Sequence, residues 1–229
     1  MRNTSEILKA RLEDAGIRYW AGDNISEVMQ KGDKEGLIEE LTPKFEAVLD
    51  SLVIDRQNDP NSQETGRRLS KMYVNELMVG RYDPKPNATA FPNHTNEPYT
   101  GMLVVRSELK SVCSHHHQPV TGVAYIGIIA ADTLIGLSKY TRIAQWCARR
   151  GTLQEELAMD IAREIKAATG SEDVGVYIQA THGCCENRGI HAHSSLTQTT
   201  VLRGQFHNDP ACKKEFMDNI NLQQQFAPR

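Results

Sequence analysis

The hydrophobic positions near the start of the chain repeat with the period of an α-helix. Residues 4–15 carry them three and four apart, and residues 34–52 carry a longer stripe of the same kind, so two amphipathic helices are predicted. Pro43 is a candidate interruption of the second helix, because proline removes a backbone donor. We therefore expect an N-terminal helical region over residues 1–58, with its apolar stripes packed on one another or on a neighbouring subunit.

The following stretch again has a helical period. In residues 64–82 the apolar side chains share one face, while Arg68 and Lys71 lie three residues apart on another. Gly80 is the expected end of this helix. Residues 83–101 hold four prolines and no apolar period, which predicts a long loop.

The pattern then becomes that of β-strands. Apolar runs at residues 102–112 and 120–129 predict two paired strands. The run at 174–181 is continuous, as is typical of a strand buried on both faces, and a last strand is expected over 199–206. The segment between the first two strands therefore lies at a strand end or in the connection that joins them.

Helical periods return between and after these strands. Asp132 is a candidate cap for a helix that ends near residues 149–151, and Thr152 begins another that Gly170 stops. A closing helix is expected over residues 210–220. The order after the N-terminal helices is ββααββα, and we find no internal repeat.

Charge and composition narrow the class of protein. The chain has 229 residues, a net charge of -3 and five cysteines. Basic residues never run beyond two in a row, which gives a nucleic-acid surface no support, and no segment approaches the roughly 20 apolar residues of a membrane span. The N-terminus has no apolar signal-peptide core and the cysteine count is odd, so we expect a cytoplasmic protein with reduced thiols, some of them metal ligands.

The strongest chemical signal is the sequence Cys-Ser-His-His-His at residues 113–117. Three consecutive imidazoles cost solvation if buried and gain little from packing, so coordination or proton transfer is favoured over a core role. Some seventy positions later a second group of possible ligands occurs, comprising His182, Cys184, Cys185 and His191. We expect the fold to bring the two groups together.

Cys113, His116 and Cys184 offer two thiolates and one imidazole, a set that suits zinc with a fourth position open. A closed structural site would need a fourth protein ligand, for which the candidates are His115, His117 and Cys185. The paired C-x2-C spacing of a structural zinc site is absent, which favours the open, catalytic arrangement.

Acid, base and phosphate-binding candidates surround these ligands. His115 and His182 are the natural proton-transfer partners, since His182 lies two residues before Cys184. Ser138, Lys139, Arg142 and Arg188 could together clamp a polyphosphate, although each alone is more typical of a surface residue. Gln154 and Glu155 follow a turn, and the carboxylate could accept hydrogen bonds from a guanine edge.

Several short motifs occur in a fixed order. They read KMYVNEL from Lys71, CSHH from Cys113, GLSKYTRI from Gly136, LQEEL from Leu153 and HGCCENRG from His182. In this order and spacing the chain resembles the GTP cyclohydrolase I family over about residues 59–220.

The resemblance implies an α+β T-fold, an antiparallel β-sheet with a helix pair on one face, in a catalytic domain over residues 59–229. It implies a toroidal homodecamer with sites between subunits, and a zinc-dependent hydrolase of GTP. Water adds at C8 of GTP, the imidazole ring opens and formate leaves, and rearrangement and ring closure give 7,8-dihydroneopterin triphosphate. The product would feed pterin, tetrahydrofolate and one-carbon metabolism or deazapurine synthesis.

The resemblance also implies a role for each matching residue. The zinc ligands are Cys113, His116 and Cys184, and the proton-transfer residues are His115 and His182. The substrate contacts are Ser138, Lys139, Arg142 and Arg188 for the triphosphate, Gln154 and Glu155 for guanine, and Arg68 with Lys71 as a basic pair reaching a neighbour's site.

Departures from the family pattern keep alternatives open. Ser114 replaces a glutamate beside the first ligand, and Glu156 replaces an arginine after Gln154-Glu155. His117 and Cys185 are additional donors, and Gly66 stands where Thr-Pro is common. The alternatives to an active GTP cyclohydrolase I are a T-fold relative acting on another nucleotide and a noncatalytic zinc-binding oligomer.

Overall fold

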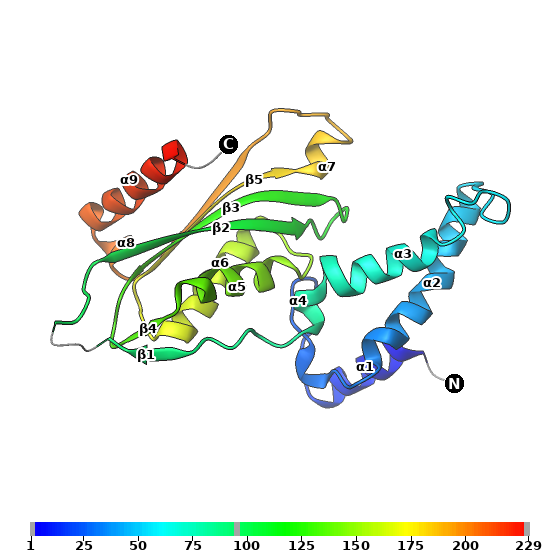
Figure 1. Ribbon diagram of the computed structural model, residues 1–229, viewed down its shortest axis with the longest axis horizontal. Coiled ribbons are helices and arrows are strands. Elements are labelled where there is room, and N and C mark those ends of the chain that lie inside the picture. Colours follow the sequence, from blue (N-terminus) through cyan, green and yellow to red (C-terminus); the bar gives the residue numbers. More distant parts are fainter. Residues whose placement is uncertain (1–2, 94–96, 227–229) are drawn as a thin grey trace. The chain divides into compact units, whose positions relative to one another are not determined.

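The computed structural model describes residues 3–93 and 97–226 and divides into two compact units, Met1–Pro84 and Lys85–Arg229. Figure 1 shows the elements of each unit. Compactness thus places a boundary at Pro84, later than the expected end of the N-terminal region at residue 58. A catalytic domain that begins at residue 59 stays a prediction, because compactness does not test the extent of a catalytic domain.

The first unit is helical throughout. Its elements are α1 (Thr4–Asp14), the 3₁₀ turn η1 (Ser26–Val28), α2 (Asp33–Ser51), α3 (Thr65–Met72), the π-helical turn η2 (Tyr73–Leu77) and α4 (Val79–Tyr82). Its core is formed by Leu8, Leu37, Ile38 and Val74. The two helices expected from the N-terminal pattern are therefore confirmed.

Two details of this unit differ from what single residues suggested. Pro43 lies inside α2 and does not interrupt it. Gly80 does not end the third helical stretch, because it lies within α4, which continues to Tyr82. The helix ends before Asp83, whose extended backbone is the conformation that a following proline imposes.

The close packing of α3 on α2 explains Gly66. A Cβ atom at this position would lie 3.0 Å from the Thr42 carbonyl oxygen and 2.5 Å from Cγ of Glu46. One turn later the buried Ser70 donates its hydroxyl to the Gly66 carbonyl oxygen at 2.8 Å. A larger side chain at position 66 would push the two helices apart.

The second unit is built on a four-stranded antiparallel sheet with the order β2-β3-β5-β6. The strands are β2 (Met102–Val112), β3 (Pro119–Ile129), β5 (Val174–His182) and β6 (Thr197–Leu202). The first three confirm the strands predicted from the apolar runs. The expected last strand over 199–206 is wrong at its end, because the chain turns at Gly204 and residues 205–208 form the short helix α8 (Gln205–Asn208).

A second, two-stranded sheet corrects two further expectations. It pairs β1 (Ala90–Pro92) with β4 (Thr133–Ile135). The stretch 83–101 is therefore not a continuous loop. Asp132 caps no helix; it precedes β4, and its carbonyl oxygen accepts the Asn93 N–H at 2.8 Å. Short strands of this kind carry too few residues for periodicity to reveal them.

One face of the main sheet is covered by α5 (Leu137–Ala148) and α6 (Gln154–Thr169), the expected helix pair. Ala124, Ile126 and Ile128 of β3 point into the core beneath these helices. Gly170 ends α6 in the left-handed conformation, as its position predicted.

The opposite face is covered as well, by α8 and α9 (Pro210–Phe226). Phe206 and Phe216 meet edge to face, with ring centroids 5.1 Å apart, over the cross-strand pair Gly127 and Gly175. A Cβ atom at Gly127 would lie 2.6 Å from the Phe216 ring. Both faces of the sheet are therefore buried, which is why β5 reads as a continuous apolar run. Among the described residues no helix is long and apolar enough to cross a membrane.

Candidate metal centre and active site

The end of β2, the start of β3 and the end of β5 lie together at one end of the main sheet. The last pair of the β2–β3 hairpin is Val112 with Pro119, and Val120 pairs with His182 at the end of β5. The connection 113–118 and the one-turn helix α7 (Gly183–Glu186) therefore lie side by side, although they are some seventy residues apart in sequence.

The hairpin connection is a compact turn. The Cys113 N–H donates to the Gln118 carbonyl oxygen at 3.0 Å, and the His117 N–H donates to the Cys113 carbonyl oxygen at 2.9 Å. His117 has a φ of 52°, a left-handed conformation that closes the turn. Cys113 is buried while His115 and His116 are exposed, so the turn fixes one thiol in the protein and presents two imidazoles.

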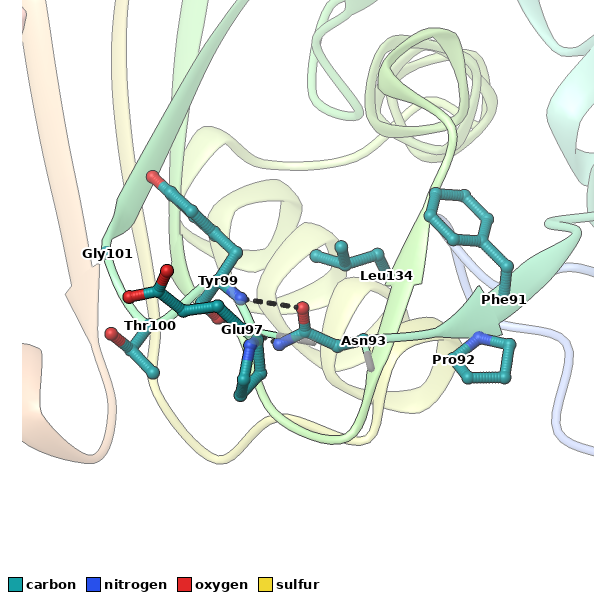
Figure 2. A pocket seen from close by; sticks show the side chains of 9 residues that line it. Phe91, Pro92, Asn93, Glu97, Tyr99, Thr100, Gly101 and Leu134 are labelled. Carbon is teal, nitrogen blue, oxygen red and sulfur yellow. Dashed lines mark hydrogen bonds between the residues drawn. The ribbon is translucent and has the colours of Figure 1, made fainter. Parts of the chain in front are cut away.

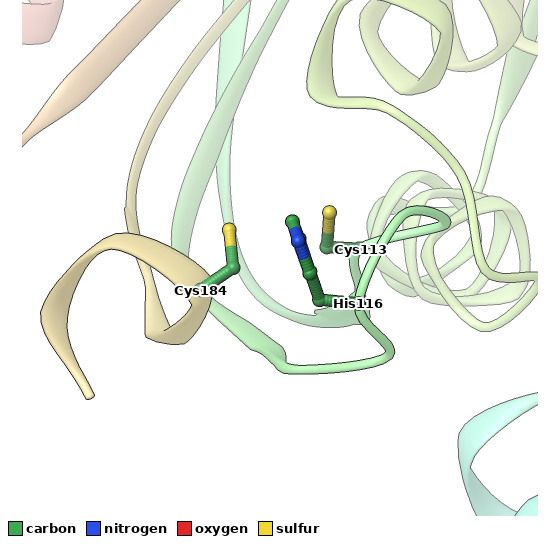
Figure 3. A group of neighbouring side chains, drawn as sticks. All are labelled: Cys113, His116 and Cys184. Carbon is green, nitrogen blue, oxygen red and sulfur yellow. The ribbon is translucent and has the colours of Figure 1, made fainter. Parts of the chain in front are cut away.

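The ligand atoms of Cys113, His116 and Cys184 all lie within 4.8 Å of one another. Figure 3 shows the two cysteines and the imidazole converging, with Cys184 contributed by α7. No fourth His, Cys, Asp or Glu of residues 3–93 and 97–226 joins this group, so the candidates for a closed site, His115, His117 and Cys185, lie outside it. The convergence expected from the sequence is confirmed, and the role of these atoms as metal ligands stays a prediction.

The electrostatics of this group fit a cation. Burial, the neighbouring Cys113 and the Cys185 sulfur at 4.0 Å raise the pKa of the Cys184 thiol to about 11. Two thiolates this close repel each other, and a divalent cation between them would reverse that repulsion. Two sulfur donors with one imidazole suit zinc.

His182 lies beside the group at the end of β5. Its Nε2 lies 2.7 Å from Oε1 of Gln154, the first residue of α6. Burial lowers the pKa of His182, and the carboxylates of Glu155 and Glu186 oppose that shift. A weakly basic imidazole at the rim of a metal group is a suitable proton-transfer residue.

The contacts of Gln154 with β6 are the part of this site that sequence reasoning missed. Its Nε2 donates to the Thr197 carbonyl oxygen and to Oγ1 of Thr199, each at 3.2 Å. No motif pointed to either threonine, since they lie on a strand that is brought next to α6 only by the fold.

The basic residues of α5 lie far from the three candidate metal ligands Cys113, His116 and Cys184, which we call the metal group. Ser111, at the end of β2, donates its hydroxyl to the carbonyl oxygen of Ala148, the last residue of α5, at 2.6 Å. Ser138 precedes Ala148 by ten residues, about 15 Å of helix axis, so the start of α5 is remote from Cys113. Lys139 and Arg142 follow Ser138, and among the described residues neither forms an ion pair.

The remaining predicted contacts are divided between the units. Glu155 and Arg188 are both exposed and lie at the end of the sheet that holds Cys113 and Cys184. Glu155 follows Gln154 in α6, and Arg188 lies two residues after the end of α7. Arg68 and Lys71 are exposed on α3, in the first unit, where Arg68 donates to the Asn61 carbonyl oxygen at 3.3 Å.

A separate hollow of about 580 Å³ lies before the start of β2. Figure 2 shows Asn93 and Tyr99 hydrogen-bonded across it, with Phe91 and Leu134 nearby. The 11-residue strand β2 separates this hollow from Cys113 by about 35 Å. It therefore belongs to another part of the molecule than the metal group.

The motifs that build the site can be compared with known proteins. The model of the family described as GTP cyclohydrolase I matches residues 41–221. The chain belongs to the GTP cyclohydrolase I family. This confirms the family predicted from the motifs, and with it an enzyme of that class. The family has the T-fold, with which the observed antiparallel sheets and helices agree.

Relatives within the family match most of the chain. A protein named GTP cyclohydrolase 1 from Flavobacterium johnsoniae is 39% identical over 194 residues, which cover 84% of this chain and 85% of the relative. Proteins of the same name from Aeromonas salmonicida and Vibrio cholerae are 33% and 32% identical, and cover 93% and 96% of this chain and 95% and 98% of their own length.

The departures from the family pattern can now be placed. Ser114 lies in the hairpin connection next to Cys113. Glu156 lies in the first turn of α6, where its carboxylate accepts the Thr152 hydroxyl at 3.2 Å. An acidic residue at this end of a helix is stabilised by the helix dipole, so Glu156 has a structural explanation. The family match also begins inside α2, earlier than residue 59.

Proposed function

We propose that this chain is a zinc-dependent GTP cyclohydrolase I that converts GTP and water into 7,8-dihydroneopterin triphosphate and formate. The observation that carries the proposal is the convergence of Cys113, His116 and Cys184 within 4.8 Å. The names of the relatives support the substrate and reaction. Production of pterins for tetrahydrofolate and one-carbon metabolism, or of deazapurines, belongs to the same proposal.

Zinc fits the residues that are present. Cys113, His116 and Cys184 would hold it and, within the described chain, leave a fourth position open. When bound, zinc supplies Lewis-acid activation of water at neutral pH.

The protein's own residues bind the substrate and move protons. We assign proton transfer to His115, exposed in the hairpin connection, and to His182 at the end of β5. The exposed carboxylate of Glu155 is suited to accept hydrogen bonds from the guanine N–H and amino groups, and Arg188 to contact a phosphate.

The position of α5 favours a site that is shared between copies of the chain. Ser138, Lys139 and Arg142 are remote from Cys113 along the helix, yet they match the triphosphate contacts of the family. We therefore propose that these residues serve the metal group of a neighbouring subunit, and that Arg68 with Lys71 contributes similarly. A homodecamer, as the family resemblance implies, would bring such surfaces together.

The test is product analysis. Zinc-loaded protein is incubated with GTP, and formate is measured together with neopterin fluorescence after oxidation. Equal amounts of the two products are expected. No product under saturating zinc would refute the proposed reaction.

A second candidate is a T-fold relative that acts on a different nucleotide, favoured by Ser114 beside the metal group. Thermal-shift measurements with a panel of purine nucleotides distinguish the two. Stabilisation by another nucleotide and not by GTP would favour this second candidate.

A further inference from the structure

The connection between α5 and α6 is buried, although it is a loop. Residues 149–153 join the end of α5 to Gln154, the first residue of α6. Arg150, Gly151 and Thr152 are buried in this connection, and so is Gln154. Most connections run over the surface of a protein, where water satisfies their backbone. A connection enclosed in this way fixes where the next helix begins.

Arg150 ties this connection to both helices. The residue is only 3% exposed. Its guanidinium carbon lies 3.7 Å from the centroid of the Trp146 ring, and Nη2 donates to Sγ of Cys147 at 3.7 Å. In addition, Nη1 lies 3.6 Å from Oδ2 of Asp160. Trp146 and Cys147 belong to the last turn of α5 and Asp160 to the second turn of α6, so one side chain joins the two helices.

The energetics of a buried guanidinium favour a positioning role for Arg150. Removing a guanidinium and a carboxylate from water costs about as much as their attraction returns, so a buried ion pair adds little net stability. Nε of Arg150 has no hydrogen-bond partner among the described residues, so the contacts with Trp146, Cys147 and Asp160 hold the group. A planar guanidinium between a ring face and a carboxylate is restricted in its orientation. The main contribution of Arg150 is therefore to the geometry of the connection.

One end of the connection is attached near the metal group, and the other end begins α6. The carbonyl oxygen of Ala148 accepts the Ser111 hydroxyl at 2.6 Å, and Ser111 lies two residues before Cys113. At the other end the Leu157 N–H donates to the Leu153 carbonyl oxygen at 2.9 Å and closes the first turn of α6. A shift of the connection would therefore move the start of α6 relative to Cys113.

We propose that Arg150 is a positioning residue that fixes the connection 149–153 and thereby sets Glu155, in the first turn of α6, against the guanine edge of GTP. The inference rests on the guanine contact proposed for Glu155. Gln154 and Glu155 are the pair that the family resemblance implies for guanine, and both directly follow the connection. A carboxylate accepts hydrogen bonds from N1–H and the 2-amino group of guanine together only within a narrow range of positions. A displacement of about 1 Å at the start of α6 therefore weakens recognition of the base.

Hydrogen exchange tests the effect on the connection without a nucleotide. In the zinc-loaded protein without GTP, Arg150→Met should speed exchange over residues 149–157 by about tenfold, while residues 166–170 at the far end of α6 keep their rate. Methionine retains the length of the side chain without its charge, and Asp160 keeps its ion pair with Arg163 at 2.8 Å. Mass spectrometry of peptic fragments measures both segments. Unchanged exchange, or equal acceleration along all of α6, would overturn the inference.

The choice between two nucleotides tests the effect on base recognition. Inosine triphosphate is GTP without the 2-amino group, so it lacks one of the two hydrogen bonds assigned to Glu155. Arg150→Met should lower the preference for GTP over inosine triphosphate, measured as the ratio of the two kcat/KM values, by about tenfold. A merely structural role would lower both kcat/KM values by the same factor, and that result would overturn the inference.

Two further variants complete the test. Arg163→Met is the matched control, because Arg163 also pairs with Asp160 but its side chain is 58% exposed. It should change neither the exchange over residues 149–157 nor the preference for GTP. If Arg150→Met does not fold, Arg150→Lys decides, since it retains a charge opposite Asp160 but loses the planar guanidinium. It should show both changes at a smaller size, and unchanged exchange and preference in this variant would overturn the inference.

Failure of the proposed reaction is distinguishable from failure of this inference. Calorimetric affinities for GTP and inosine triphosphate give the same preference without turnover. A protein that is not a GTP cyclohydrolase I would lack turnover before any substitution and leave the exchange and affinity results readable. Binding of neither nucleotide by the unsubstituted protein would refute the guanine contact of Glu155 and the inference with it.

Discussion

At the scale of single residues, the site separates side chains that hold the metal from those that act beside it. The Cys184 sulfur belongs to the group of three donors, whereas His182 lies outside that group. Cys184→Ala should therefore lose zinc, while His182→Ala should retain zinc and bind GTP but fail to open its ring. Zinc per chain is measured by atomic absorption and GTP binding by calorimetry. Equal loss of zinc in both variants would show that the two roles are wrongly assigned.

A second prediction concerns Tyr140 in α5. The residue is fully buried, its hydroxyl has no hydrogen-bond partner in the described chain, and burial raises the pKa of Tyr140 to about 12. A buried hydroxyl without a partner costs about 1–3 kcal/mol, so Tyr140→Phe should stabilise the protein by about 1 kcal/mol. Denaturant unfolding measures the change.

The control for Tyr140 is a tyrosine whose hydroxyl is used. Tyr99 donates its hydroxyl to the Met102 carbonyl oxygen at 2.9 Å, so Tyr99→Phe should not stabilise the protein. Destabilisation by Tyr140→Phe would mean that its hydroxyl has a partner, such as a buried water.

At the scale of elements, α8 and α9 pack closely on one face of the sheet. Gly127→Ala would place a Cβ atom 2.6 Å from the Phe216 ring and 2.9 Å from the Phe206 ring. Overpacking of this kind costs typically about 1–3 kcal/mol, more than alanine gains over glycine in a strand. We expect a lower melting temperature, measured by calorimetry.

Gly136→Ala is the matched control for this substitution, because the nearest atom to its added Cβ would be 3.9 Å away. Equal stability losses in the two variants would argue against a specific contact between the sheet and the two phenylalanines.

At the scale of the whole molecule, the separation of α5 from the metal group predicts complementation between subunits. His182→Ala and Arg142→Ala should each be inactive alone. If a site combines His182 of one copy with Arg142 of another, oligomers assembled from an equal mixture should regain about a quarter of the sites, since each site needs two intact halves. GTP turnover after co-refolding measures the recovery. A mixture as inactive as its components would place both residues in one subunit's site.

The sequence by itself determined the features that depend on neighbours in the chain. The apolar periods predicted α1, α2, β2, β3 and β5, and Gly170 marked the end of α6, because helix and strand patterns arise from local backbone geometry. The cysteines and histidines, in the order in which their motifs occur, also predicted the family. They could do so because a motif can be read in the sequence without knowledge of the fold.

Only the tertiary structure decided which of these pieces meet. Strand pairing brings Cys113 and Cys184 to the same end of the sheet. The last residue of α5 contacts the end of β2, so the first residues of α5 lie far from Cys113. The course of β6 beside α6 holds Gln154 against Thr197 and next to His182. The sequence pattern did not predict β1 and β4, because a strand of three residues is too short to show an alternation of apolar and polar positions. In each case the strand pairing or side-chain contact joins residues that are far apart in the chain. Local sequence propensity does not predict such contacts.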